Sequence, residues 1–89
     1  MLFEKREKKR ISVTIFDQEY IVRSHEDGEY VNRLASHLDE KMRDIRRKNQ
    51  VLSPYKVAVL AALNLTDELF KVRAEHEELI DLIEETKIR

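Results

Sequence analysis

The sequence contains no cysteine, and it has a single glycine, Gly28, and a single proline, Pro54. Without cysteine the chain has no disulfide framework, no thiolate metal site and no thiol nucleophile. One glycine is too few for a glycine-rich loop that binds phosphate through its backbone N–H groups. So few breakers also favour long helices over a loop-rich or all-β fold.

Long apolar runs and an excess of either charge are absent as well. No run approaches the roughly 20 residues that a membrane span needs, and residues 1–10 are too polar for a signal peptide. The chain has 17 basic and 18 acidic residues, a net charge of −1, which points globally to neither nucleic acid nor an acidic partner. We expect a cytoplasmic protein without membrane insertion and without a nucleic-acid partner.

Residues typical of catalysis are sparse. His25, His37 and His76 are far apart in the sequence, and none forms the i, i+4 pair that places two imidazoles on one metal ion. No serine lies in a nucleophile-elbow pattern. We therefore expect no enzyme, with no catalytic residue, no metal site and no cofactor.

The composition that is present suits amphipathic helices. Of 89 residues, 42% are hydrophobic and 39% are charged, so the chain is apolar enough to fold as one small domain. A chain this short buries a modest fraction of its surface, which makes a second chain an expected source of additional core.

The N-terminal segment, residues 1–9, is rich in charge. We interpret it as a frayed terminus that keeps the first strand solvated. A basic arm that binds nucleic acid is the alternative, although two glutamates dilute its positive charge.

Residues 10–23 predict a β-hairpin. Residues 11–16 alternate at period two and are rich in β-branched side chains. With Asp17-Gln18 as a two-residue loop, Phe16 pairs with Glu19 and Ile15 with Tyr20. This register places on one face, which something must cover, the apolar residues Ile11, Val13, Ile15, Tyr20 and Val22.

A first helix is predicted from Asp27, a candidate N-cap, to Lys48. Apolar residues recur along it at helical spacing and form a face suited to cover the hairpin: Val31, Leu34, Ala35, Leu38, Met42 and Ile45. Residues 41–48 contain five basic residues and one acid. Such a stripe is ordinarily a solvated face, but its density also indicates an acidic partner.

A second helix is predicted from Pro54 to Arg89, with Ser53 as the N-cap. About 36 residues give a rod of roughly 54 Å, several times what a hairpin and one helix can shield. Its first half, residues 57–70, is apolar on several sides and is expected to be buried all round.

The second helix also carries a coiled-coil seam, in which successive members are four and three residues apart. We predict a dimer interface made of Leu60 together with the seam residues Ala58, Ala62, Leu65, Leu69, Val72, His76, Leu79 and Ile83. At His76 the alternatives are a polar residue that sets the register and a pH-sensitive contact. The segment 75–85 has six acids and no basic residue, which favours antiparallel pairing.

These elements predict an α+β fold with an N-terminal β-hairpin, one short helix and one long C-terminal coiled-coil helix that dimerises. We expect a single domain in which residues 1–53 form a globular head and residues 54–89 form the dimerisation helix.

The order of three segments resembles the ZapA family of bacterial cell-division proteins, in the short form of Gram-positive bacilli. These segments are residues 13–20 (VTIFDQEY), 39–42 (DEKM) and 57–70 (VAVLAALNLTDELF). The resemblance covers about residues 10–85, and the helical block is its most specific part. Asp17 stands where the family usually has glycine at the hairpin turn.

The resemblance implies a non-enzymatic partner of FtsZ, the tubulin-like GTPase of the division ring, at the mid-cell division site. Proteins of this family dimerise through the long helix, can pair dimers into tetramers and crosslink FtsZ filaments. Charged residues of the head are implicated in FtsZ binding. Transfer by position makes candidates of Gln18 at the hairpin tip and of the basic residues Lys41, Arg43, Arg46, Arg47 and Lys48. A small dimeric nucleic-acid-binding protein and a generic coiled-coil adaptor are the alternative functions.

Overall fold

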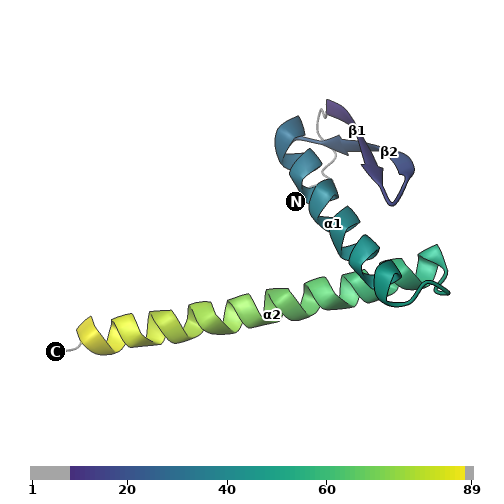
Figure 1. Cartoon of the computed structure of the whole chain (residues 1–89). Helices are drawn as coiled ribbons and strands as arrows, with labels where there is room; N and C mark the ends of the chain where they lie inside the picture. Colours follow the sequence, from purple (N-terminus) through teal and green to yellow (C-terminus); the bar gives the residue numbers. More distant parts are fainter. Residues whose placement is uncertain (1–8, 88–89) are drawn as a thin grey trace.

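The computed structural model describes residues 9–87, in which a two-stranded hairpin precedes two helices (Figure 1). The elements are β1 (Lys9–Ile15), β2 (Gln18–Ser24), α1 (Gly28–Lys48) and α2 (Pro54–Lys87). This order confirms the predicted α+β fold class. The segment 1–8, predicted to be a frayed terminus or a basic arm, lies outside the described residues.

Strands β1 and β2 pair antiparallel, but in a register two residues away from the predicted one. Ile15 pairs with Gln18, so the two-residue loop is Phe16-Asp17 and the predicted loop Asp17-Gln18 is wrong. Ile15 therefore does not pair with Tyr20, and Phe16 belongs to the loop. Both loop residues have positive φ angles, 51° and 66°, as the type I′ turn of a two-residue hairpin requires.

The shift leaves the predicted faces of the hairpin unchanged, because side chains alternate with a period of two. Ile11 and Val13 are buried beneath α1, and Ile15 and Val22 pack against them. Tyr20 shares this face but is 51% exposed, so one chain covers the apolar face only in part.

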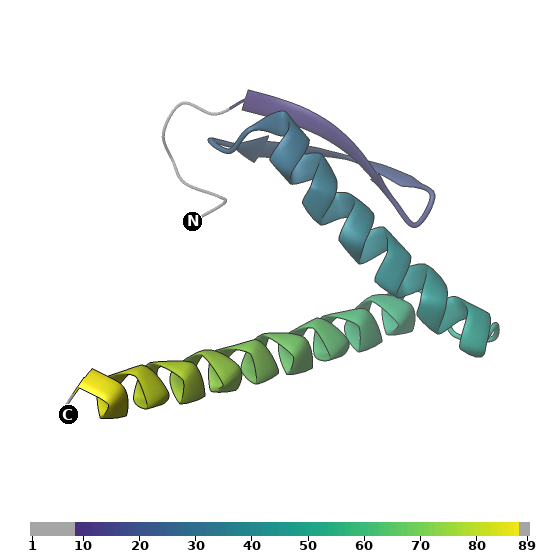
Figure 2. The ribbon, with the colours of Figure 1, turned by 60° about the vertical axis from the view of Figure 1, so that its left-hand side comes forward.

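The first half of helix α1 covers the hairpin, and its second half packs against α2 (Figure 2). Helix α1 begins after Asp27 as predicted, although the Asp27 side chain makes no capping hydrogen bond. Val31 and Ala35 join the hairpin cluster, while Met42 joins a second cluster with α2. Leu34 belongs to the predicted apolar face but is 40% exposed.

Helix α2 contacts α1 within its first half, as far as the ion pair between Glu68 and Lys41, and then runs away from the head (Figures 1 and 2). Ser53 is the N-cap, because its Oγ accepts the N–H of Lys56 at 3.2 Å. Val57 and Ala61 are fully buried against α1. The radius of gyration is 17.7 Å, compared with about 12 Å for a compact chain of this length.

The prediction that residues 57–70 are buried all round is wrong for the single chain. Leu63 and Phe70 are each 63% exposed. Only one side of this segment meets α1, because the hairpin and α1 offer α2 no second surface. The remaining apolar side chains of the segment stay open to solvent.

The junction of the helices is tested by shortening a buried valine. We expect Val57→Ala to lower the free energy of unfolding by about 2 kcal/mol, because it removes two methyl groups from a fully packed site. The matched control is Val51→Ala, at a residue 90% exposed, which should change it by less than about 0.5 kcal/mol. Urea unfolding at one fixed protein concentration measures both, and equal losses would contradict the assigned junction.

Candidate functional site

The hairpin turn is fastened to α1 by one carboxylate and one guanidinium. Asp39 Oδ1 accepts the backbone N–H of Phe16 at 2.6 Å. Arg43 donates from Nε to Asp39 Oδ2 at 2.9 Å and from Nη2 to Asp17 Oδ1 at 2.8 Å. We call Asp17, Asp39 and Arg43 the turn latch. The latch ties both loop residues to α1, which compensates for a left-handed backbone that phenylalanine rarely adopts.

The same contacts shift the proton affinity of the latch. The hydrogen bonds from Arg43 and then from the Phe16 N–H hold the pKa of Asp39 below its ordinary value. In turn, the Asp39 and Asp17 carboxylates raise the pKa of Arg43 above its ordinary range. Asp39 and Arg43 are therefore both charged at neutral pH.

The Phe16 side chain connects the turn to the core and to the basic end of α1. It packs against the cluster of Met42, Val57 and Ala61. The guanidinium carbon of Arg46 lies 5.0 Å from the centre of the Phe16 ring, a cation–π distance. The Arg46 Nε is buried and donates to no acceptor among the described residues.

A small hollow of about 300 Å³ opens beside the turn. We call it the turn hollow, and the residues lining it are Phe16, Asp17, Arg43, Arg46 and Arg47. Three of its five lining residues are arginines. Arg43 is engaged in the latch, and Arg47 pairs with Asp44 one turn away on α1. Among the described residues, Arg46 is therefore the arginine of the hollow that pairs with no carboxylate.

The predicted FtsZ-binding residues divide into separate places. Gln18 and Arg46 border one groove of about 850 Å³ between the hairpin turn and the start of α2, which Tyr20, Ile21 and Tyr55 also line. Arg46 lines both this groove and the turn hollow, so the groove that Gln18 borders adjoins the turn hollow at Arg46.

Lys41 and Lys48 lie elsewhere on α1. Lys41 forms an ion pair with Glu68 of α2, so its charge helps to hold the two helices together. By the step of about 100° per residue in an α-helix, Lys48 lies on the side of Lys41 and away from Arg46. Lys48 is exposed in the last turn of α1.

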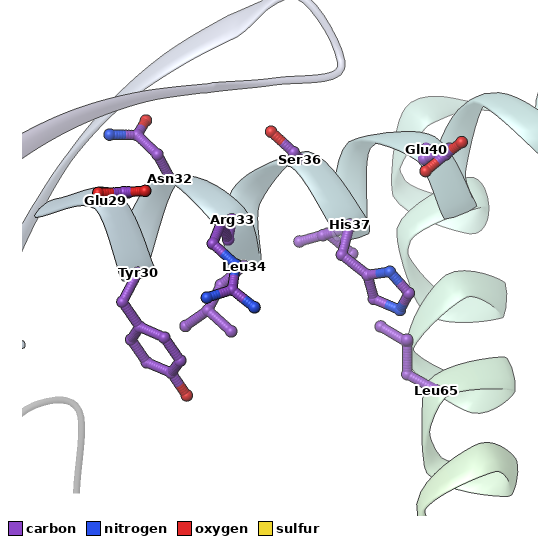
Figure 3. A pocket seen from close by; sticks show the side chains of 10 residues that line it. Glu29, Tyr30, Asn32, Arg33, Leu34, Ser36, His37, Glu40 and Leu65 are labelled. Carbon is purple, nitrogen blue, oxygen red and sulfur yellow. The ribbon is translucent and has the colours of Figure 1, made fainter. Parts of the chain in front are cut away.

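The angle between α1 and α2 encloses a second open hollow, of about 900 Å³. Figure 3 shows Tyr30, Leu34 and His37 projecting from α1 on this side, with Leu65 of α2 nearby. A half-exposed leucine and tyrosine at such a hollow leave an apolar surface that one chain does not fill.

Most of the predicted seam on α2 is open to solvent. Leu69, Val72, Leu79 and Ile83 are between 46% and 61% exposed. Ala58 is half-buried against the junction with α1, and Leu65 lines the hollow in Figure 3. The other predicted members, Leu60, Ala62 and His76, are exposed. The seam therefore starts beside the head and continues along the free part of α2.

Sequence reasoning missed the turn latch and the pairing of Lys41 with Glu68. The spacing of Asp39 and Arg43, four residues apart on a predicted helix, was an available signal for their ion pair. The contacts of Asp39 with Phe16 and of Arg43 with Asp17 span 23 and 26 residues, and no local pattern encodes them.

Two kinds of site are absent from the described part of the chain. Across residues 9–87 no three His, Cys, Asp or Glu side chains gather as potential metal ligands. Neither described helix has a stretch long and apolar enough to cross a membrane.

A head of one hairpin and one helix, joined to a long helix with an exposed heptad seam, is typical of small proteins that function as oligomers. The family model described as "Cell division protein ZapA" matches residues 11–89, and the chain belongs to this family of cell-division proteins. The ZapA protein of Halalkalibacterium halodurans is 37% identical over 83 residues, covering 93% of this chain and 87% of its own. That of Shouchella clausii is 40% identical over 70 residues, covering 79% and 90%.

Solved structures show the same fold. A ZapA mutant dimer from Geobacillus stearothermophilus superposes with a TM-score of 0.70 at 28% identity, covering 92% of this chain and 95% of its own. A protein of Pseudomonas aeruginosa PAO1, described as an unknown conserved bacterial protein, gives 0.62 at 29% identity, covering 90% and 98%.

The turn latch is tested by removing the charge of Asp39. Because the pKa of Asp39 is lowered in the folded chain, its contribution to stability is complete above the unfolded value of about 3.9 and is lost as the pH falls through the folded value. Asp39→Asn should therefore be less stable than the wild type at pH 7, and the difference should shrink under acid conditions. Urea unfolding across that pH range measures it.

The matched control is Asp44→Asn, which removes a carboxylate from an exposed ion pair on the same helix. It should change the stability little, because exposed pairs contribute little. A stability difference between wild type and Asp39→Asn that stayed constant down to strongly acidic pH would refute the assigned role of Asp39.

Proposed function

We propose that the chain forms a homodimer through α2 and crosslinks FtsZ filaments, promoting assembly and stability of the division ring at mid-cell. The observation that carries this proposal is the exposed heptad seam of α2 in a member of a cell-division family. A crosslinker needs at least two binding heads on one rigid body, and a dimer of this chain has two. Weak contacts of each head would add by avidity along a polymer.

The dimer is supported by what the single chain leaves uncovered. Leu69, Val72, Leu79 and Ile83 are all largely exposed and share one helix face. Burial of these side chains against a second α2 removes apolar surface from water at about 25 cal/mol per Å². The related structure from Geobacillus stearothermophilus is described as a dimer. Pairing of dimers into a tetramer is compatible with the remaining exposed apolar residues of α2.

The head is proposed to bind the filament beside the hairpin turn. Arg46 and Arg47 line the turn hollow, and Gln18 borders the adjoining groove. Of the remaining candidates, Lys41 and Arg43 hold internal ion pairs, and Lys48 lies on another side of α1. The filament contact is therefore assigned to Gln18, Arg46 and Arg47, with Arg43 fixing the shape of the turn.

Charge reversal tests the assigned contact surface. Arg47→Glu should weaken co-sedimentation with FtsZ in GTP by about tenfold in affinity, because it replaces attraction by repulsion at the interface. Pelleting with GDP gives the background, and circular dichroism checks that the head remains folded.

The matched control is Lys71→Glu on α2. Lys71 is similarly exposed and also pairs with an aspartate one turn away, but it lies outside the seam and far from the turn hollow. Its affinity for FtsZ should stay within about twofold of wild type. Equal weakening by both variants would show that overall charge, and not the turn surface, controls binding.

The seam is tested by placing a charge in its middle. Leu69→Asp should dissociate the dimer, because an aspartate buried between helices loses its hydration. Light scattering should then give the mass of a monomer. Ala74→Asp, on the opposite side of α2 by the heptad pattern, should remain dimeric. A Leu69→Asp variant that is still dimeric would show that another surface joins the chains.

A further inference from the structure

Among the described residues, Arg46 has the buried side-chain donor that no hydrogen-bond acceptor of the chain satisfies. Arg43 donates to two carboxylates and Arg47 to one, whereas no acceptor among the described residues meets the buried Nε of Arg46. A buried donor without an acceptor is unfavourable, so a hydrogen bond from the guanidinium to an incoming acceptor lowers the free energy. In the free chain the guanidinium rests instead on the ring of Phe16.

We propose that Arg46 receives a carboxylate side chain of an acidic protein partner in the turn hollow. This inference rests on the proposed function, since the partner surface is taken to be that of the FtsZ filament. The Arg46 guanidinium turns from Phe16 toward the entering carboxylate and donates from both Nε and Nη in the paired geometry that arginine and carboxylates form. Phe16 stays beneath it as an apolar floor.

A single carboxylate fits the charges of the hollow better than a polyphosphate does. Arg43 is already neutralised by Asp17 and Asp39, and Arg47 pairs with Asp44. Three arginines are thus matched by three carboxylates, so the hollow carries no excess of positive charge that would attract a polyanion, and the Asp17 carboxylate at the rim repels a second anion. Among the described residues, Arg46 is the arginine of the hollow that contacts no carboxylate. A protein binds a nucleic-acid backbone by neutralising several phosphates at once, whereas a single side-chain carboxylate is neutralised by one guanidinium.

Arg46 is thereby distinguished from its neighbour Arg43, which faces the same hollow. Arg43 is a positioning residue: it shapes the turn through Asp17 and Asp39. Arg46 makes no such internal hydrogen bond, so its replacement by lysine keeps the charge and the fold. That replacement removes the paired donors and with them the preference for a carboxylate.

The test follows the Nε–H resonance of Arg46 by nitrogen–proton correlation NMR, assigned by its loss in Arg46→Lys. The full-length protein is titrated with a blocked oligoglutamate peptide and, in parallel, with the matching oligoglutamine peptide. We expect the glutamate peptide alone to shift this resonance in a saturable way. We also expect Arg46→Lys to bind that peptide about tenfold more weakly, while Arg33→Lys, an exposed arginine of the same helix, binds it as the wild type does.

An unmoved Arg46 resonance, or equal weakening by Arg33→Lys, would overturn the proposal. A single-stranded oligonucleotide that shifts the resonance at lower concentration than the glutamate peptide would also overturn it, in favour of phosphate. A parallel FtsZ co-sedimentation separates this proposal from the function on which it rests. Wild type that fails to pellet rejects the FtsZ assignment, while Arg46→Lys that pellets as well as wild type rejects only the role of Arg46.

Discussion

The long helix α2 carries more apolar surface than its own chain can bury. The arrangement of the rest of the structure depends on this constraint. The first turns of α2 lie against α1 through Val57 and Ala61, which are fully buried. Beyond Glu68, which forms an ion pair with Lys41 of α1, the helix runs free, and large apolar residues such as Leu69 and Val72 are exposed. An exposed apolar face of this extent is unfavourable for a soluble monomer and is typical of an interface.

A second constraint acts at the other end of the head. Phe16 and Asp17 form a two-residue turn with positive φ angles at both positions, a conformation that glycine adopts far more readily. The structure stabilises it from outside, since Asp39 accepts the Phe16 N–H and Arg43 bridges to Asp17. Arg43, which bridges to the turn, also belongs to the basic stripe of α1, residues 41–48, so the shape of the hairpin tip and the placement of Arg46 and Arg47 depend on each other.

Much of the fold could be predicted from local sequence, and the departures have physical causes. Ser53-Pro54 marked the start of α2 correctly because capping and the preference for proline at the first position act within a few residues. The hairpin loop was placed one residue too late, because Phe16-Asp17 lacks the glycine signal of such turns. Its contacts with Asp39 and Arg43 come from residues 23 and 26 positions away. For the same reason the basic stripe, residues 41–48, could be recognised from the sequence. The sequence could not separate the residues that pair within the chain from those that are available to bind a partner. A heptad repeat is a local pattern, so the seam could be predicted from the sequence. The surface that covers it is not part of the single chain, and the dimer interface stays a prediction.

In the proposed dimer, α2 joins two heads, and the dimer therefore crosslinks filaments. One head is then sufficient to bind a filament, whereas bundling of filaments requires two. The most direct measurement compares wild type with the seam variant Leu69→Asp on preassembled FtsZ filaments, using electron microscopy for bundles and sedimentation for bound protein. The account predicts that wild type bundles the filaments, while the variant still sediments with them, more weakly, and leaves them single. Bundling by a variant shown to be monomeric would contradict it, because one head on one chain would then be sufficient to crosslink.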